Sequence, residues 1–450
     1  MTSLRSLFCI LIFSLPFLQS DAQKVTGSYW RVDYPASTAK GELQIAVTYQ
    51  IWIPDGVKKI RAVIIHQHGA GTTAANAGRT ASEDLQWQAL AAKWDCALLG
   101  PSYHVLNERI DDSTGSAELW FDPRRGSDRA LLRALRQLGG ESGHPELADA
   151  PWCLWGHSGG GIWSDIMTML YPERVIAVWL RSGTAFMFRG MKEFAQPDTI
   201  PGALYRIPIV CNPGIKENKN RVGIGNLATF KEYRAAGGLV CFAEDPLSGH
   251  DCGYSRSLAI PFFDACLSMR LPDSKNCYAP LKPIDTTKAW LGSLTDKTAY
   301  PAKEYKGNSA EAVWLPNERI AKDWMEYVRT GAVKDNTPPP APFDLFMTDS
   351  AGSALLSWNT TADFESGVGG FIILRDGKEL AKLLPEHPEL TYGHGLFQFG
   401  KINYYHDTPE YPVPQMKYAD STAKGTKHQY AVIALNSEGL RSKETNAKWK

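Results

Sequence analysis

A serine between glycines is the first place in this sequence where the residue types could perform chemistry. Gly-His-Ser-Gly-Gly occupies residues 156–160, after an apolar run at 150–155, and apolar residues then recur at helical spacing from Ile162 to Leu170. A G-x-S-x-G sequence between a strand and a helix forms a sharp turn that exposes the serine hydroxyl. The pattern predicts that Ser158 is a nucleophile for acyl transfer. A glycine-rich turn with an incidental serine is the alternative.

A general base and an acid to orient it follow in the chain order serine, acid, histidine. An apolar run at 207–211 predicts a strand, and Glu217 is the first carboxylate in the loop after it. A second run at 238–243 is followed by a loop that contains His250. These positions predict His250 as the general base and Glu217 as the orienting acid. Asp245 remains an alternative acid, because it precedes His250 in the same loop.

An oxyanion formed during acyl transfer needs backbone N–H groups that are already in place around it. The apolar run at 61–65 is followed by His-Gln-His-Gly-Ala-Gly at residues 66–71, which resembles the HGGG-type loop of lipases and esterases. In that family this loop supplies an oxyanion donor. The resemblance therefore implies Ala70 and Gly159 as the two donors. The two histidines of the loop have the spacing of a metal pair, but no third ligand at zinc-like spacing lies nearby, so no metal site is predicted.

The elements that must position these residues alternate between strands and helices. From about residue 25 to residue 271 the ordered motifs resemble the α/β-hydrolase fold. The resemblance implies an α/β class with a mostly parallel sheet covered by helices on both faces. The remaining predicted elements are antiparallel first strands at 25–32 and 42–53, further strands at 95–100 and 174–180, and helices at 85–94 and 127–138.

The first 22 residues have the composition of a cleavable signal peptide. Arg5 is followed by an apolar stretch at 7–18 and by the small residues Ser20 and Ala22. This stretch is shorter than the about 20 residues that a spanning helix needs, and no integral membrane segment is predicted. We therefore expect a secreted or periplasmic protein. The 48 basic and 48 acidic residues balance, which argues against nucleic acid as a partner.

The chain of 450 residues is long enough for more than one domain. A proline-rich linker at 335–342 separates a predicted hydrolase domain at 23–334 from a second domain at 343–450. Within the first domain, residues 273–317 are expected to be irregular, and 318–328 to form an amphipathic helix. Of the eight cysteines, only Cys252, Cys266 and Cys277 are expected as disulfide partners, since the others lie in predicted strands or in the signal peptide.

The C-terminal domain resembles a fibronectin type III sandwich. The similarity rests on strand-like segments at 355–358, 371–377 and 430–436, with Trp358 in the core and a late tyrosine, Tyr430. A long insertion, roughly at 383–425, departs from the family pattern and is rich in aromatic residues. Its rings could stack on sugars or fill the core. A metal site at His394 and His406 within it is the less favoured alternative.

Together these motifs predict an exported serine hydrolase that cleaves carboxylic esters, including carbohydrate-linked or polymeric ones, without a cofactor. Esters are preferred over amides by analogy with the family alone. An exported serine peptidase and a non-catalytic binding protein with a relic hydrolase domain are the alternatives. The loops at 103–123 and 184–205 are expected above the sheet, where Trp120, Phe121, Phe186 and Phe188 could form either a pocket wall or a buried lid core. The oligomeric state is not indicated.

Overall fold

The computed structural model describes residues 26–70, 78–105, 119–188, 200–273, 279–384, 416–425 and 427–450. The predicted signal peptide, Cys277, and most of the aromatic insertion, including His394 and His406, lie outside these residues. So do parts of the two loops expected above the sheet, and the side chain of Phe188.

An eight-stranded sheet forms the centre of the molecule, in the order β1-β2-β4-β3-β5-β6-β7-β8. Strands β1 and β2 are antiparallel to each other, β2 is antiparallel to β4, and all other pairs are parallel. This is the α/β-hydrolase-like arrangement that the sequence predicted. The strand bounds are Gly27–Tyr34 (β1), Val47–Pro54 (β2), Val63–Gln67 (β3), Ala97–Tyr103 (β4), Trp152–His157 (β5), Val175–Arg181 (β6), Ile209–Asn212 (β7) and Val240–Phe242 (β8).

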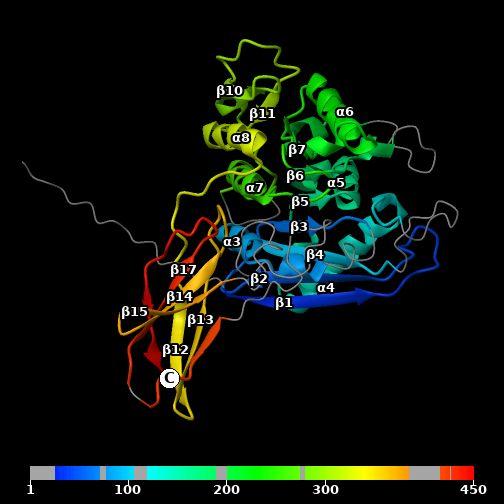
Figure 1. The fold of residues 1–450 in the computed structure, drawn as a ribbon. Coiled ribbons are helices and arrows are strands. Elements are labelled where there is room, and N and C mark those ends of the chain that lie inside the picture. Colours follow the sequence, from blue (N-terminus) through cyan, green and yellow to red (C-terminus); the bar gives the residue numbers. More distant parts are fainter. Residues whose placement is uncertain are drawn as a thin grey trace, which may run out of the picture.

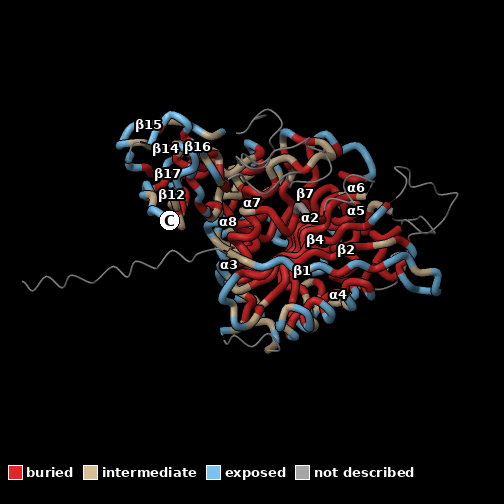
Figure 2. Tube along the Cα trace, turned by 90° about the horizontal axis from the view of Figure 1, so that it is seen from below, coloured by how far each residue is buried: buried red, intermediate tan, exposed pale blue. Residues whose placement is uncertain are grey.

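Helices cover both faces of this sheet. Figure 1 shows α7 on one side of strands β5 to β7, and α5 and α6 on the other. Figure 2 shows the centre of the sheet buried, as expected for parallel strands packed on both faces. The helix bounds are Gly78–Ser82 (α2), Leu85–Lys93 (α3), Ser127–Ser142 (α4), Gly159–Leu170 (α5), Arg221–Ala235 (α6) and Arg256–Arg270 (α7).

Helix α4 continues four residues beyond its predicted end at Leu138. Gly139 is buried within the helix, and the helix stops only at Gly143, whose φ of 77° is left-handed. A left-handed glycine after the last turn is a common helix terminator, because glycine has no Cβ to clash there. The helix therefore continues through Gly139 and ends before Gly143.

The prediction that the segment at 273–317 is irregular is wrong for part of its described residues. It contains the strands Trp290–Ser293 (β9), Thr298–Pro301 (β10) and Val313–Leu315 (β11), which form an antiparallel sheet in the order β10-β9-β11. Strands of three or four residues are too short to show alternation in the sequence. The predicted amphipathic helix is present as α8, Glu318–Thr330, and its Trp324 indole donates to the carbonyl of Phe242 at 2.8 Å.

The C-terminal residues form two four-stranded sheets, β16-β13-β12-β19 and β15-β14-β17-β18. Their arrangement is that of a fibronectin type III-like sandwich. Trp358 is buried edge-on against Phe371, with ring centroids 5.2 Å apart, as expected for the core tryptophan. The bounds are Phe343–Ser350 (β12), Ser353–Asn359 (β13), Gly370–Arg375 (β14), Lys378–Leu383 (β15), Lys417–Asp420 (β16), Tyr430–Leu435 (β17), Thr445–Asn446 (β18) and Lys448–Trp449 (β19).

The sandwich contacts helix α3 and helix α8 of the larger unit. The Gln86 side-chain amide donates to the carbonyl of Phe364 at 2.9 Å, and the Lys93 ammonium lies 4.8 Å from the centroid of the Phe364 ring. Arg319 of α8 pairs with Glu365 at 3.0 Å. The loop at 363–366 therefore docks on both helices.

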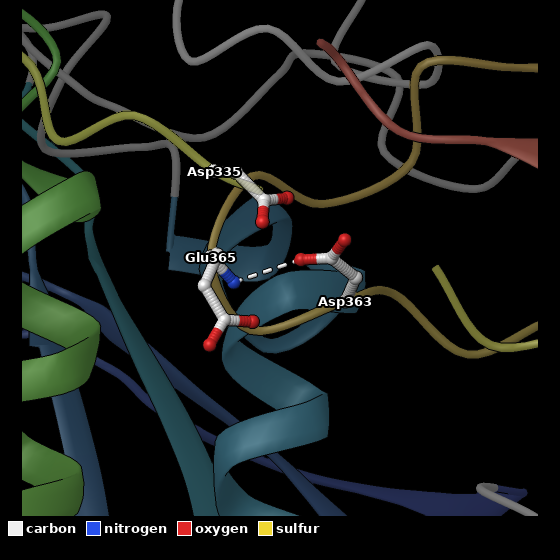
Figure 3. Close-up of side chains that lie close together, drawn as sticks. All are labelled: Asp335, Asp363 and Glu365. Atoms are coloured by element: carbon white, nitrogen blue, oxygen red, sulfur yellow. Dashed lines mark hydrogen bonds between the residues drawn. The ribbon is translucent and has the colours of Figure 1, made fainter. Parts of the chain in front are cut away.

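Three carboxylates converge at this loop, as Figure 3 shows: Asp363 and Glu365 belong to it, and Asp335 lies beside it. Asp335 begins the predicted linker, yet it is buried, and it accepts hydrogen bonds from Ser366 at 2.6 Å and Asn436 at 2.7 Å. Burial raises the pKa of Asp363 to about 7, and the neighbouring Asp335 charge adds to the increase. Hydrogen bonds from Ser366 and Thr337 hold the pKa of Asp335 below its ordinary value, against the opposing effect of burial.

We expect Asp363→Asn to remove a pH dependence of stability. Because the folded-state pKa of Asp363, about 7, lies above its ordinary value of 3.8, its contribution is full below about pH 4 and is lost as pH rises through 7, a loss on the order of 4 kcal/mol. An asparagine amide resembles the protonated acid at every pH. Denaturant unfolding between pH 4 and 8 measures this, with the exposed Asp349→Asn as the matched control. Parallel pH profiles for wild type and Asp363→Asn would contradict the prediction.

Candidate active site

Ser158 occupies the tight turn between strand β5 and helix α5. Its φ of 52° and ψ of −115° lie in a region that residues other than glycine rarely adopt. The turn is held on both sides: the Ser158 amide donates to the carbonyl of Arg181 at 2.8 Å, and the Ser158 carbonyl accepts from Ile162 at 3.0 Å. The strained backbone is thus fixed by the adjacent strand and by the first turn of the helix.

Glycine is required on both sides of this turn. A Cβ on Gly156 would lie 2.1 Å from the carbonyl oxygen of Gly160, and a Cβ on Gly160 would lie 2.3 Å from that of Gln67. These contacts are too short for any side chain. The glycines therefore bring helix α5 close to strands β3 and β5, as the sequence predicted.

Three of the predicted site residues form one hydrogen-bonded chain. His250 Nε2 lies 2.8 Å from Ser158 Oγ, and His250 Nδ1 lies 2.6 Å from Glu217 Oε1. The other carboxylate oxygen, Oε2, accepts from the Ser182 hydroxyl at 2.6 Å and from the Gly214 amide at 3.1 Å. Glu217 is 2% exposed, whereas the His250 side chain is 35% exposed. A buried carboxylate beside Nδ1 favours the tautomer with its proton on Nδ1, in which Nε2 can accept the serine proton.

Asp245, the alternative acid, has other partners. Its Oδ1 accepts from the amides of Leu247 at 2.9 Å and Ser248 at 3.3 Å, and its Oδ2 lies 3.8 Å from Arg181. The carboxylate shapes the start of the loop that carries His250. Of the two acids left open by the sequence, Glu217 is the one in contact with the histidine ring.

The loop after β3 lies directly against the serine turn. A Cβ on Gly159 would stand 3.0 Å from the Ala70 amide nitrogen, and a Cβ on Gly69 would stand 3.2 Å from the Ser158 Cβ. The two amides predicted as oxyanion donors, those of Ala70 and Gly159, are therefore neighbours. Gly159 is also the first residue of α5, where unpaired N–H groups favour negative charge.

The two histidines before this loop are buried. His66 belongs to strand β3 rather than to the loop, and its ring stacks on Trp155 with centroids 4.0 Å apart and planes at 9°. The ring of His68 meets that of His66 edge-on at 5.0 Å. Among the described residues, the only His, Cys, Asp and Glu side chains close enough together to hold a metal are those of the Asp335 cluster.

The aromatic residues considered for a substrate pocket are mostly buried. Trp120 and Phe121 are each 1% exposed and Phe186 is 4% exposed, and Trp120 stacks on Tyr103 at 4.2 Å. Their burial favours the alternative of a packed core beneath the loops. No disulfide joins Cys252 to Cys266 in the described part of the chain.

Sequence reasoning missed two residues that hold the His250 loop, His157 and Arg181. His157 Nε2 lies 2.6 Å from the carbonyl oxygen of His250, and Arg181 Nε donates to the carbonyl of Asp251 at 2.9 Å. Neither contact was predicted from the sequence. The one available signal was a charged residue at the end of an apolar strand run, because a buried arginine needs several acceptors.

The sequence matches no protein-family model and no curated protein. Among solved structures, it is similar to a thermostable esterase (16% identity, TM-score 0.33, covering 48% of this chain and 54% of the esterase). It is also similar to an S-formylglutathione hydrolase from Agrobacterium tumefaciens (14% identity, TM-score 0.39, covering 54% of this chain and 94% of the hydrolase). A ferulic acid esterase is similar at 12% identity and a TM-score of 0.40, covering 54% of this chain and 98% of the esterase. A central fibronectin type III array of RIM-binding protein is similar at 13% identity and a TM-score of 0.16, covering 24% of this chain and 33% of the array.

The chain spans about half the length of that thermostable esterase. Because these similarities are weak, the fold is assigned from the strand order of this chain and not from the matches. None of the helices in the described ranges has the length and apolar character needed to cross a bilayer.

Proposed function

We propose that this protein is a serine hydrolase that cleaves carboxylic esters through an acyl-enzyme. The observation that carries the proposal is the hydrogen-bonded chain from Ser158 through His250 to Glu217, at a strained turn with two backbone amides beside it. A relic hydrolase domain would have no need to keep this geometry.

In the first half of the reaction, Ser158 Oγ attacks the ester carbonyl carbon while His250 Nε2 takes its proton. The carbonyl oxygen becomes an oxyanion that accepts hydrogen bonds from the amides of Ala70 and Gly159. His250 then returns the proton to the leaving alkoxide, which departs as the alcohol and leaves an acyl group on Ser158. Glu217 stabilises the transient imidazolium.

In the second half, water attacks the acyl carbon and gives its proton to His250. The tetrahedral intermediate collapses, the carboxylic acid leaves, and His250 returns the proton to Ser158 Oγ. The atoms balance with ester and water alone, so these steps need no metal or organic cofactor.

Several wider features belong to the same proposal. Residues 1–22 would direct export to the periplasm or medium, and 343–450 would form an accessory domain after the linker at 335–342. Buried apolar side chains form two clusters, one drawn from residues 32–328 and one from 345–434, which supports this division.

A fluorophosphonate probe tests the proposal. We expect stoichiometric labelling of the wild-type protein, with the added mass on the peptide that contains Ser158, because only an activated serine reacts rapidly with such probes. A panel of aryl esters and aminoacyl amides then identifies the scissile bond. Absence of both labelling and turnover would favour the binding-protein alternative, and preferred cleavage of amides would favour the peptidase.

A further inference from the structure

Three successive carbonyl oxygens in the His250 loop point inward onto two buried side chains. Arg181 donates to the carbonyls of Gly249 and Asp251, and His157 Nε2 lies 2.6 Å from the carbonyl of His250 itself. We propose that Arg181 and His157 are positioning residues that place the general base relative to the nucleophile. This inference rests on the proposed function of Ser158 and His250.

Arg181 is the last residue of strand β6, and its side chain is fully buried. Its Nε donates to Asp251 O at 2.9 Å, and its Nη2 to Ser248 Oγ at 2.6 Å and to Gly249 O at 3.3 Å. Nη1 donates to Asn212 O at 3.1 Å. The guanidinium thus bridges the end of β7 and the turn that carries His250. A lysine ammonium, with three donors on one atom, could not span these acceptors.

The same residue also holds the nucleophile. The main-chain carbonyl of Arg181 accepts the Ser158 amide at 2.8 Å, while its side chain holds the base loop. His157 and Arg181 are register partners across the β5–β6 pair. His157 and Arg181, which are neighbours in the sheet, therefore connect the turn of Ser158 to the turn of His250. The Asp245 carboxylate, 3.8 Å from Arg181, offsets the charge of the buried guanidinium.

His157 completes the support from the nucleophile side. It precedes Ser158 in the chain, and its ring lies 5.2 Å from the His250 ring, centroid to centroid. The other edge of its ring faces the oxyanion loop, since a Cβ on Gly69 would lie 3.0 Å from His157 Nδ1. The imidazole thus fills the space between the two loops and donates to the base loop.

The test distinguishes the effect of the hydrogen bond from His157 to the His250 carbonyl from the effect of the volume of the His157 ring. We expect His157→Phe to lower kcat for a short aryl ester and the rate of fluorophosphonate labelling by about 10²-fold, because a displacement of about 1 Å in a catalytic group has that cost. KM should stay within about twofold. His157→Gln should recover part of kcat, because its amide can donate to the same carbonyl. Arg181→Lys should also lower kcat.

Arg234→Lys is the matched control for Arg181→Lys. Arg234 is equally a buried arginine that donates to backbone carbonyls, at Ala312 (2.7 Å), Gly238 and Ser309, none of which belongs to the His250 loop. Its replacement should affect the free energy of unfolding but not kcat. If Arg181→Lys does not fold, the two His157 variants decide the question.

A second readout does not depend on turnover. The proton between His250 Nδ1 and Glu217, across 2.6 Å, should give a downfield proton resonance in the resting protein. This resonance should shift or broaden in His157→Phe and return toward its wild-type position in His157→Gln. A wild-type kcat and an unchanged resonance in His157→Phe would overturn the inference. Full activity in Ser158→Ala would instead refute the proposed function.

Discussion

Ser158→Ala is expected to abolish hydrolysis, with kcat falling by about 10⁶-fold, because the hydroxyl oxygen forms the acyl bond and no neighbouring group replaces it. Probe labelling should be lost as well. The fold should persist, since alanine lacks only the hydroxyl and meets the same backbone strain at a φ of 52°. Active-site titration and steady-state kinetics on one aryl ester measure the effect, and circular dichroism checks the fold.

Ser164→Ala supplies the matched control. Ser164 is a buried serine further along the same helix, α5, and it lies outside the hydrogen-bonded chain described above. It should keep wild-type labelling and turnover. Retained turnover in a folded Ser158→Ala protein would show that another residue is the nucleophile.

Glu217→Gln is expected to lower kcat by about 10⁴-fold, the loss seen when an orienting acid is replaced by its amide in the serine protease template. The amide nitrogen would compete to donate to His250 Nδ1, which favours the tautomer that cannot accept the serine proton at Nε2. The replacement also removes the charge that stabilises the imidazolium. KM should change little, because Glu217 is 2% exposed and lies behind the histidine.

Asp245→Asn distinguishes this explanation from general damage to the loop. The asparagine carbonyl can still accept from the amides of Leu247 and Ser248, whereas the pairing with Arg181 at 3.8 Å is weakened. Its effect on kcat should be far smaller than that of Glu217→Gln. The reverse order of effects would identify Asp245 as the orienting acid.

The alternation of strands and helices could be predicted because it depends on short-range patterns. Buried parallel strands need continuous apolar runs, and helices need apolar residues at three- and four-residue spacing. Sharp turns need glycine, which is why Gly156 and Gly160 revealed the position of Ser158. The loops with Glu217 and His250 followed from the same reasoning, since each comes directly after an apolar run.

Short strands and helix ends were harder to predict from the sequence. The antiparallel sheet of β9, β10 and β11 went unnoticed because its strands have three or four residues, which is too few to establish a period. The burial of Asp335 was also missed. The segment around Asp335 has the composition of a linker. Asp335 is buried because it accepts hydrogen bonds from Ser366 and Asn436, which lie far along the chain.

The sequence by itself thus determined the class of fold, the tight turn that carries Ser158, and the loops that carry Glu217 and His250. Only the tertiary structure decided that Glu217 rather than Asp245 contacts His250, and that Arg181 and His157 contact the loop of His250. The physical reason is distance along the chain. Local patterns report the conformation of a few neighbouring residues, whereas these contacts join groups 33 to 93 positions apart, which meet only when the strands have packed in one register.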